Sequence, residues 1–567
     1  MRLLFLFLLF VLSSCGQTEM YDVLITNAKI YDGSGSPAFD GVLAIRGDTI
    51  AAMGAEVSGK GVVEINAMGQ AVAPGFINML SWATESLIHD GRGLSDLVQG
   101  VTLEVMGEGT SMGPLNDQMK QDIKSSQGDI KYDISWSTLG EYLQYLEDKG
   151  VSPNVASFVG ATTVRIHEIG YEDRPPSVDE LERMKQLVRE AMEEGAVGLG
   201  SSLIYAPAFY ADTEELIELS KVIAEYDGLY VTHMRSEGNN VIEALGEVMR
   251  IASAANCRAE IYHLKAAGEA NWPKMEEMIT KIELARQAGV RVAANMYNYT
   301  AGATGLNAAM PPWVQEGGYQ EWARRLQDPA IRKKVASEMR TDATEWENLY
   351  FLAGSPENVF LVGFKNDTLR HYTGKSLAEV ASIRGTSPEI TAIDLVIEDG
   401  SRVGTVYFLM SEENIKRQLK LPYMTFGSDA SALAPEGVFL QSNPHPRAYG
   451  NFARLLGKYV RDEQVIPLED AIRKLTYQAA VKLRINRRGL LKPGFYADVV
   501  IFDPNTIQDH ATFENPHQLA TGVQHVFVNG KQVLKDGEHT GATPGRFVKG
   551  AHYESAGQEM EIESDQE

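Results

Sequence analysis

The middle of the chain alternates between helix-like and strand-like segments, and this alternation most limits the folds available to it. Two segments, 178–193 and 213–226, carry apolar residues at the three- and four-residue spacing of a helix. Short apolar segments typical of buried strands lie at 196–199, 229–232, 258–262 and 290–294. Repeated helix–strand alternation favours a parallel sheet. We therefore predict an α/β fold, most simply a TIM-type (β/α)8 barrel.

Both ends of the chain are rich in strand-like segments, and its 567 residues leave room for a second, smaller domain. Short apolar segments punctuated by glycine and proline fill residues 21–73, and the pattern returns within 485–550. These two segments predict one small β-sandwich domain, which leaves 74–484 for the barrel. Within the barrel, polar and helical sequence from about 315 to 415 breaks the rhythm. We interpret it as an insertion, suited to act as a lid.

Residues 1–20 have the features of an export signal. Arg2 precedes an apolar run, Leu3 to Leu12, which is too short to span a bilayer but typical of a signal peptide. The run leads into Ser13-Ser14-Cys15, and this junction resembles a bacterial lipobox, in which cleavage leaves the cysteine as a lipid-modified N-terminus. We therefore expect a lipoprotein of the bacterial cell envelope, anchored to a membrane through Cys15. An ordinary secretory signal is the alternative.

The charge balance limits the partners of the chain. Its formal net charge is -24, and part of the excess lies in an acidic tail, 551–567. A strongly acidic protein repels phosphate, so nucleic acid is a poor candidate. The expected partners are a small molecule and, through the lipid anchor, a membrane.

Polar side chains stand where three expected barrel strands end. His233 follows 229–232, His263 follows 258–262, and Asp429 follows the apolar segment that ends at Phe426. Active sites of barrels lie at the carboxyl ends of the strands, so these side chains are expected to meet. Imidazole and carboxylate suit zinc, which keeps one position open for water in catalytic sites. Alone, Asp429 would be interpreted as a helix N-cap, so the prediction depends on the three residues together.

Short stretches along the chain resemble the N-acyl-D-amino-acid deacylase (D-aminoacylase) branch of the amidohydrolase superfamily. They are Ala73–Asn78, Glu194–Leu199, Leu203–Pro207, Thr232–Gly238, Tyr297–Gly302, Gly427–Asp429, His445–Arg447 and Leu491–Asp498. The likeness extends from about residue 21 to 550. It implies hydrolysis of the amide bond of an N-acyl amino acid, with a tightly held zinc ion on His233 and His263.

The chain departs from the family pattern at a third ligand, a cysteine after the second barrel strand. The corresponding stretch, 100–109, contains no cysteine. Glu108 falls nearest to the lost thiolate, and we predict that it replaces the cysteine as a metal ligand. Glu104 is the rival, because strand alternation places both carboxylates on one face. A solvated loop carboxylate is the alternative for Glu108.

A second departure affects the first barrel strand, where the superfamily usually has a His-x-His pair. The matching positions are Leu80 and Trp82, and neither side chain can hold zinc. The looser, second metal position of the family is therefore expected to be lost. Two interpretations stay open: one zinc ion is sufficient for catalysis, which we favour, or the protein is a non-catalytic ligand-binding lipoprotein.

The resemblance also implies roles in hydrolysis. Asp429 would take a proton from the attacking water and pass it to the departing amine. Arg447 would bind the carboxylate of the substrate, helped by Lys265 and Tyr297. A serine of the family maps onto Ala303, so one polar contact is missing. A dipeptidase or carboxypeptidase-like hydrolase is the enzymatic alternative, since peptides are also acyl amino acids, and opening of a cyclic amide is a weaker one.

Overall fold

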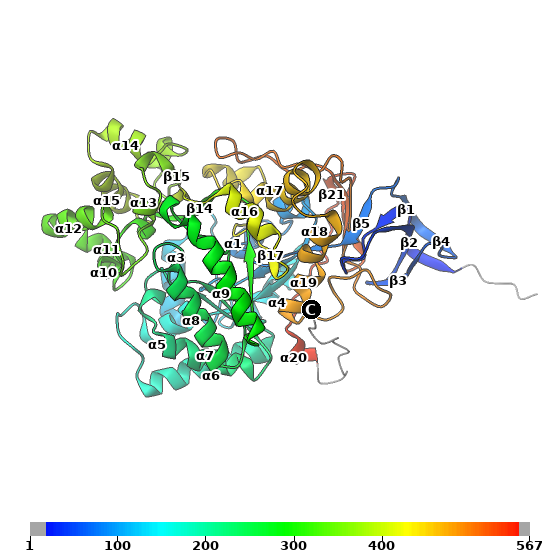
Figure 1. The fold of residues 1–567 in the computed structure, drawn as a ribbon, viewed down its shortest axis with the longest axis horizontal. Helices are drawn as coiled ribbons and strands as arrows, with labels where there is room; N and C mark the ends of the chain where they lie inside the picture. Colours follow the sequence, from blue (N-terminus) through cyan, green and yellow to red (C-terminus); the bar gives the residue numbers. More distant parts are fainter. Residues whose placement is uncertain (1–18, 555–567) are drawn as a thin grey trace, which may run out of the picture.

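A computed structural model describes residues 19–554 of the chain (Figure 1). Cys15, with the rest of the expected export signal up to residue 18, lies outside the described residues, as does the acidic tail beyond Glu554. Within 19–554, no helix is long and apolar enough to cross a membrane.

Eight parallel strands form a ring through the middle of the chain. They are β6 (Phe76–Asn78), β7 (Val101–Met106), β8 (Asn154–Ser157), β10 (Gly198–Ser202), β11 (Leu229–His233), β12 (Arg258–Ile261), β13 (Val292–Met296) and β17 (Met424–Phe426). The first three form one sheet, and the others form a second that includes β9 (Val159–Gly160), the continuation of β8. The Val197 N–H donates to the Ser157 carbonyl at one junction, and the Met79 N–H donates to the Phe426 carbonyl at the other. The predicted barrel is therefore present.

Helices follow the barrel strands as the alternation predicts. They are α1 (Thr84–His89), α2 (Leu94–Leu97), α3 (Asp117–Ser126), α4 (Leu139–Lys149), α5 (Ala161–Ile169), α6 (Val178–Glu194), α7 (Thr213–Ala224), α8 (Val241–Ala254), α9 (Met275–Gln287), α16 (Glu412–Leu419), α17 (Arg447–Arg454), α18 (Leu468–Leu475) and α19 (Tyr477–Leu483). Helix α6 begins at a capping box between Ser177 and Glu180, and ends at Gly195, whose φ of 117° favours glycine. These end signals explain why its bounds were predicted to within one residue.

The strands of both chain ends form one mixed, nine-stranded sheet. They are β1 (Met20–Ile30), β2 (Phe39–Arg46), β3 (Thr49–Gly54), β4 (Lys60–Asn66), β5 (Ala71–Pro74), β18 (Val499–Phe502), β19 (Val523–Val528), β20 (Lys531–Lys535) and β21 (Glu538–His539). Strand β5 joins the two ends, because Val72 pairs with Ile30 on one side and with Ile501 on the other. The short helix α20 (Ala551–Glu554) follows this domain.

An insertion between β13 and β17 carries its own sheet and hydrophobic core. Strands β14 (Ala301–Gly305), β15 (Val359–Gly363) and β16 (Gly404–Phe408) pair antiparallel, with Ala301 opposite Phe408. Its helices are α10 (Pro312–Gln315), α11 (Tyr319–Arg325), α12 (Pro329–Met339), α13 (Leu349–Leu352), α14 (Leu377–Arg384) and α15 (Pro388–Asp399). The sequence pattern indicated only helices here and so missed this sheet. In Figure 1 these helices lie at one end of the long axis and β1–β4 lie at the other.

Candidate metal centre

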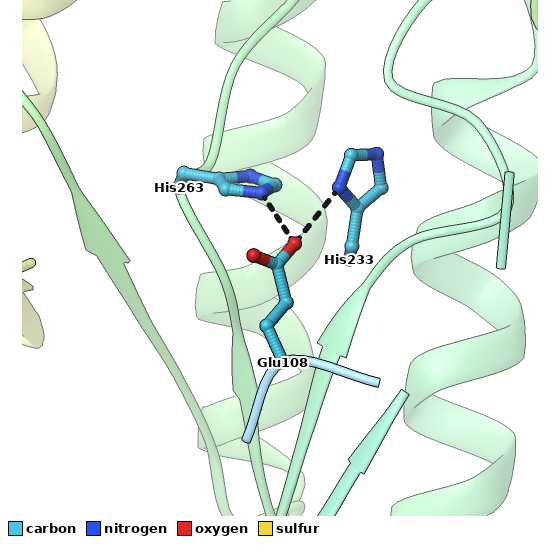
Figure 2. A group of neighbouring side chains, drawn as sticks. All are labelled: Glu108, His233 and His263. Atoms are coloured by element: carbon cyan, nitrogen blue, oxygen red, sulfur yellow. Dashed lines mark hydrogen bonds and ion pairs between the residues drawn. The ribbon is translucent and has the colours of Figure 1, made fainter. Parts of the chain in front are cut away.

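Three side chains from three barrel segments converge on one point, as Figure 2 shows. The Glu108 Oε1 atom lies 3.1 Å from the His233 Nδ1 atom and 3.1 Å from the His263 Nε2 atom. The exposed fraction of each of the three side chains is at most 6%. Two imidazole nitrogens and a carboxylate oxygen are thus held together away from solvent.

These three residues fit a zinc ion. Their ligand-type atoms all lie within 4.8 Å of one another. Ligands about 2.0–2.1 Å from a tetrahedral zinc ion stand about 3.3 Å from each other, close to the separations in this group. Three protein ligands also leave a fourth position open, as in catalytic zinc sites.

Electrostatics at the three residues favour a cation. Burial raises the pKa of the Glu108 carboxyl group, but hydrogen bonds from His233 and His263 outweigh burial and hold this pKa well below its usual range. Burial and the charge of Lys265 lower the pKa of His263, but Glu237 and Glu108 outweigh them and raise it to about 9. The carboxylates that stabilise a proton on His263 would equally stabilise a metal ion.

Glycines place Glu108 in this group. Gly107 and Gly109, on either side of Glu108, have φ values of 107° and 71°. A Cβ on Gly107 would lie 2.3 Å from the Phe158 carbonyl oxygen, so only glycine fits there. The chain can therefore turn at the end of β7 and direct Glu108 toward the histidines.

Glu104, the rival ligand, lies elsewhere. It stands within β7, and its Oε2 accepts a hydrogen bond of 2.9 Å from the Asn78 amide, which also donates to Asp96 and to the Ser428 hydroxyl. Burial and the charge of Glu104 raise the pKa of Asp96 well above its usual value. Glu104 is thus a member of a buried carboxylate pair that supports the loop after β17.

His263 and Asp429 both adopt left-handed backbone conformations, with φ values of 33° and 49°. Such conformations are uncommon outside glycine and persist only where neighbouring groups hold them. The His263 N–H donates to the Asn295 side-chain carbonyl at 2.8 Å, and the Asp429 N–H donates to the Leu80 carbonyl at 2.8 Å. Neighbouring strands thus direct both side chains into the site.

Glu237 and Lys265 form a second layer behind the histidines. Glu237 Oε1 lies 2.9 Å from His263 Nδ1 and accepts a hydrogen bond of 2.6 Å from Lys265 Nζ. Its Oε2 is 3.4 Å from His233 Nε2, although that nitrogen forms no hydrogen bond within the described residues. Burial raises the pKa of Glu237, but the charges of His233, Lys265 and His263 outweigh burial and keep it ionised. Carboxylates that contact the free nitrogen of a metal-binding histidine fix its orientation.

Asp429 lies beside this group without belonging to it. Its Oδ1 accepts a hydrogen bond of 3.1 Å from the Trp82 indole N–H, which also donates to Glu108 Oε2 at 3.0 Å. Its Oδ2 is 2.8 Å from Arg447 Nη1. Burial raises the pKa of the Asp429 carboxyl group; Arg447 opposes this effect and Glu108 adds to it.

Arg447 is held at the start of α17. Its guanidinium lies over the Tyr297 ring, with Cζ 4.3 Å from the ring centre. His445 Nδ1 accepts a hydrogen bond from the Arg447 N–H, while His445 Nε2 is 2.9 Å from the Ala301 carbonyl oxygen. Burial lowers the pKa of His445 well below its usual value, so this imidazole is neutral. The insertion thereby contributes to the placement of Arg447, whose Nη2 lies 3.5 Å from the Ala303 carbonyl.

The structure thus brings together His233, His263, Glu108 and Asp429, with Arg447 in contact with Asp429. The contact of Lys265 with Glu237 and the donor role of Trp82 were not predicted from the sequence. Glu237 was missed altogether, although it stands four residues after His233, in a turn directly beyond a barrel strand. An acidic residue at that spacing was the available signal.

Comparisons with known proteins place this chain in a family. A model described as "Amidohydrolase family" matches residues 63–534. The N-acyl-D-aspartate deacylase of Alcaligenes xylosoxydans xylosoxydans is 33% identical over 530 residues, which cover 93% of this chain and 95% of the relative. The D-aminoacylase of the same organism is 31% identical over 539 residues, which cover 94% and 99%.

Solved structures include a similar protein. The crystal structure of N-acyl-D-glutamate deacylase from Bordetella bronchiseptica, complexed with zinc and a phosphonate inhibitor that mimics the tetrahedral intermediate, matches with a TM-score of 0.78 at 27% identity. The match covers 94% of this chain and 100% of that chain. These comparisons confirm the resemblance inferred from the short stretches, and with it the fold of a barrel and a small β domain.

Proposed function

Because this chain belongs to the amidohydrolase family, we propose that it hydrolyses the linear amide bond of N-acyl amino acids, in particular N-acyl-D-amino acids. The family makes it a metal-dependent hydrolase of carbon–nitrogen bonds. In the proposal, one zinc ion is held by Glu108, His233 and His263. The substrate class follows from the names of its relatives and from the basic residue in the same site, Arg447.

One observation carries the proposal: three buried ligand-type atoms and a separate carboxylate meet at the ends of barrel strands. The donor set of Glu108, His233 and His263 is that of a catalytic zinc site. A zinc ion bound there would lower the pKa of water and polarise the scissile carbonyl. Asp429 stands beside this set as the group that can move a proton.

Asp429 accepts the proton of the attacking water and then donates it to the departing amine nitrogen. Because burial raises the pKa of its carboxyl group, Asp429 is a stronger base than an exposed carboxylate. Glu237 supports the reaction indirectly, since its contact with His263 Nδ1 fixes the imidazole that faces Glu108. Lys265, which donates to Glu237, completes this support.

Arg447 is suited to bind the α-carboxylate of the substrate. Within the described residues, its buried Nε atom makes no hydrogen bond, and its Nη1 atom forms the ion pair with Asp429 at 2.8 Å. An unsatisfied buried donor is costly, so a substrate carboxylate that accepts from the guanidinium at two points gains affinity. The Tyr297 ring packs against the guanidinium, with Cζ 4.3 Å from the ring centre. A substrate carboxylate bound to Arg447 would also weaken the ion pair between Arg447 and Asp429, which would free Asp429 for proton transfer.

Replacing Arg447 with lysine tests this role. Lysine keeps the charge but loses the two-point fork, so KM for N-acetyl amino acids is expected to rise about 10- to 100-fold, with a smaller change in kcat. Steady-state kinetics measure both constants. As a control, an N-acetyl amino amide, which lacks the carboxylate, should be hydrolysed equally poorly by the variant and the wild type. An unchanged KM for the acids would exclude Arg447 as their anchor.

A hydrolysis panel tests the proposed function itself. Purified protein of known zinc content is offered N-acetyl-D-amino acids, N-acetyl-L-amino acids and dipeptides, and the released amine is measured. We expect about one zinc ion per chain and preferred cleavage of the D-series. Preferred cleavage of dipeptides would indicate the peptidase alternative. Zinc without cleavage of any compound would contradict the substrate class, and freshly purified protein without metal would indicate a ligand-binding lipoprotein.

We further propose that the mature protein is anchored to the bacterial cell envelope by lipid on Cys15. The apolar run and the Ser13-Ser14-Cys15 junction support this proposal. The Glu19 carbonyl accepts from the Lys60 N–H, and its carboxylate pairs with Arg46 at 2.7 Å. The four residue steps from Cys15 to Glu19 span at most about 14 Å. A lipid on Cys15 would therefore hold β1 and β4 close to the membrane, with the insertion at the far end of the molecule (Figure 1).

Replacing Cys15 with serine should release the protein from membranes. In a fractionated bacterial host, the wild type is expected in the membrane fraction and the variant in the soluble fraction. The variant should keep the kcat and KM of the wild type. Mass spectrometry of the wild-type N-terminus should show acyl chains on Cys15. The same distribution of wild type and variant would contradict the anchor.

A further inference from the structure

The indole N–H of Trp82 lies between two carboxylates of the proposed site. It donates to Glu108 Oε2 at 3.0 Å and to Asp429 Oδ1 at 3.1 Å, so one hydrogen is shared between two acceptors. Glu108 belongs to the proposed ligand set, and Asp429 is the proposed acid–base group. Trp82 therefore connects the metal ligand to the group that moves protons.

Two carboxylates in one buried site repel each other unless a positive group separates them. The Glu108 carboxylate is ionised, and Asp429 must be ionised to act as a base. The other oxygen of each already faces a partner: Glu108 Oε1 faces His233 and His263, and Asp429 Oδ2 faces Arg447. Within residues 19–554, the remaining two oxygens, Glu108 Oε2 and Asp429 Oδ1, share the Trp82 indole N–H as their one common donor. A single donor hydrogen thus faces both of these carboxylate oxygens.

The backbone holds Trp82 in this position. The Trp82 backbone N–H donates to the Ala430 carbonyl at 3.0 Å, and the Ser431 hydroxyl donates to the Trp82 carbonyl at 2.9 Å. Both partners follow Asp429 directly in the chain, so the indole and Asp429 are placed by one backbone junction. The neighbouring position toward the first strand is also closed, because the fully buried Leu80 packs against Gly427, where a Cβ would lie 2.6 Å from the Leu80 Cβ.

We propose that Trp82 is a positioning residue that takes the place of a second metal ion. Its indole N–H orients Asp429 toward the reacting atoms. The same N–H keeps further cations out of the gap between Asp429 and Glu108. The chain therefore works with one ion, and added zinc does not inhibit it through a second position. This inference rests on the metal site of the proposed function and adds a role for a residue outside the ligand set.

Two variants separate the roles of Trp82. Trp82→His replaces the donor with a ligand, and it is expected to raise the zinc content from about one to about two ions per chain. A second ion beside Asp429 would compete for its carboxylate, so kcat of this variant should fall as zinc is added. Trp82→Phe keeps an aromatic ring but lacks the N–H. We expect its kcat to fall about 10- to 100-fold at saturating zinc, with little change in KM, as for other residues that orient a metal site.

Trp313→Phe is the matched control. Its indole N–H also donates to a carboxylate, Glu338 Oε2 at 2.9 Å, but within the insertion. This variant should keep one zinc ion and the kinetics of the wild type. Metal content is measured by mass spectrometry of elements after dialysis against excess zinc, and circular dichroism reports whether each variant folds.

Each outcome decides one question. One ion in wild type and two in Trp82→His, with a lowered kcat in Trp82→Phe, would support the inference. Two ions in the wild type would overturn it, and so would one ion in a folded Trp82→His together with an unchanged kcat in Trp82→Phe. If Trp82→His does not fold, the kcat of Trp82→Phe decides alone. A wild type without any ion would instead contradict the proposed function, so the two failures are distinguishable.

Discussion

Replacement of Glu108 by glutamine is expected to strip zinc from the protein and to abolish measurable hydrolysis at stoichiometric zinc. Glutamine keeps the size of the side chain but removes the negative charge that faces two imidazoles. Loss of one member of a buried charge pair costs about 3–5 kcal/mol. Since each 1.4 kcal/mol is tenfold in affinity, zinc binding should weaken by about 100- to 3,000-fold. Titration of apoprotein with zinc, read by hydrolysis and by metal content, measures the change.

Glu104→Gln is the matched control for this experiment. Both residues lie in the stretch 100–109 and were rival candidates for the same ligand. Glu104, however, accepts a hydrogen bond from Asn78 and lies outside the three-residue group. Its replacement should leave the zinc affinity within about threefold of the wild type, because it removes no charge that faces the ion. His263→Ala should reproduce the loss seen in Glu108→Gln. Retention of zinc by Glu108→Gln together with its loss from Glu104→Gln would reverse the assignment of the ligand.

The strand-end residues of the site were predictable from sequence because they follow a local pattern. His233 and His263 each come directly after a buried apolar segment, and the barrel brings such positions to one face. The role of Trp82 was not predictable in this way. Its partner Asp429 is 347 residues away, and only the junction between β6 and β17 brings the two together. The sequence revealed the loss of a histidine there, but not the hydrogen bonds that replace it.

The fold shows the same division between local and non-local information. Helix α6 was predicted closely because a capping box and a glycine mark its ends. The sequence predicted only short segments within 21–73, whereas the first strand of the structure, β1, is eleven residues long, with a bulge between Ile25 and Ala28. Asn27, with a φ of 50°, interrupts the alternation of side chains there. Strand β14 was missed because its five residues include two glycines, and its pairing with β16 joins positions about a hundred residues apart.

Replacement of Asp429 by asparagine should separate catalysis from metal binding. Asp429 is not among the three residues that face the ion, so the variant is expected to retain about one zinc ion per chain. The asparagine side chain can still accept from the Trp82 N–H, but it cannot take up a proton. General acid–base groups contribute about 100- to 10,000-fold to rate, so kcat should fall within that range while KM changes little.

The control for Asp429→Asn is the same substitution at Asp399, a buried residue of the insertion that accepts hydrogen bonds from the Lys365 and Asn366 backbone. Asp399→Asn should keep kcat within about twofold of the wild type, because it alters no group that faces the reacting atoms. Loss of zinc from Asp429→Asn would indicate that Asp429 is itself a metal ligand. One that keeps both zinc and full activity would require another base, and Glu237 cannot serve, because His263 and Lys265 already occupy its carboxylate. The combination of retained zinc and lost turnover is therefore specific to the role proposed for Asp429.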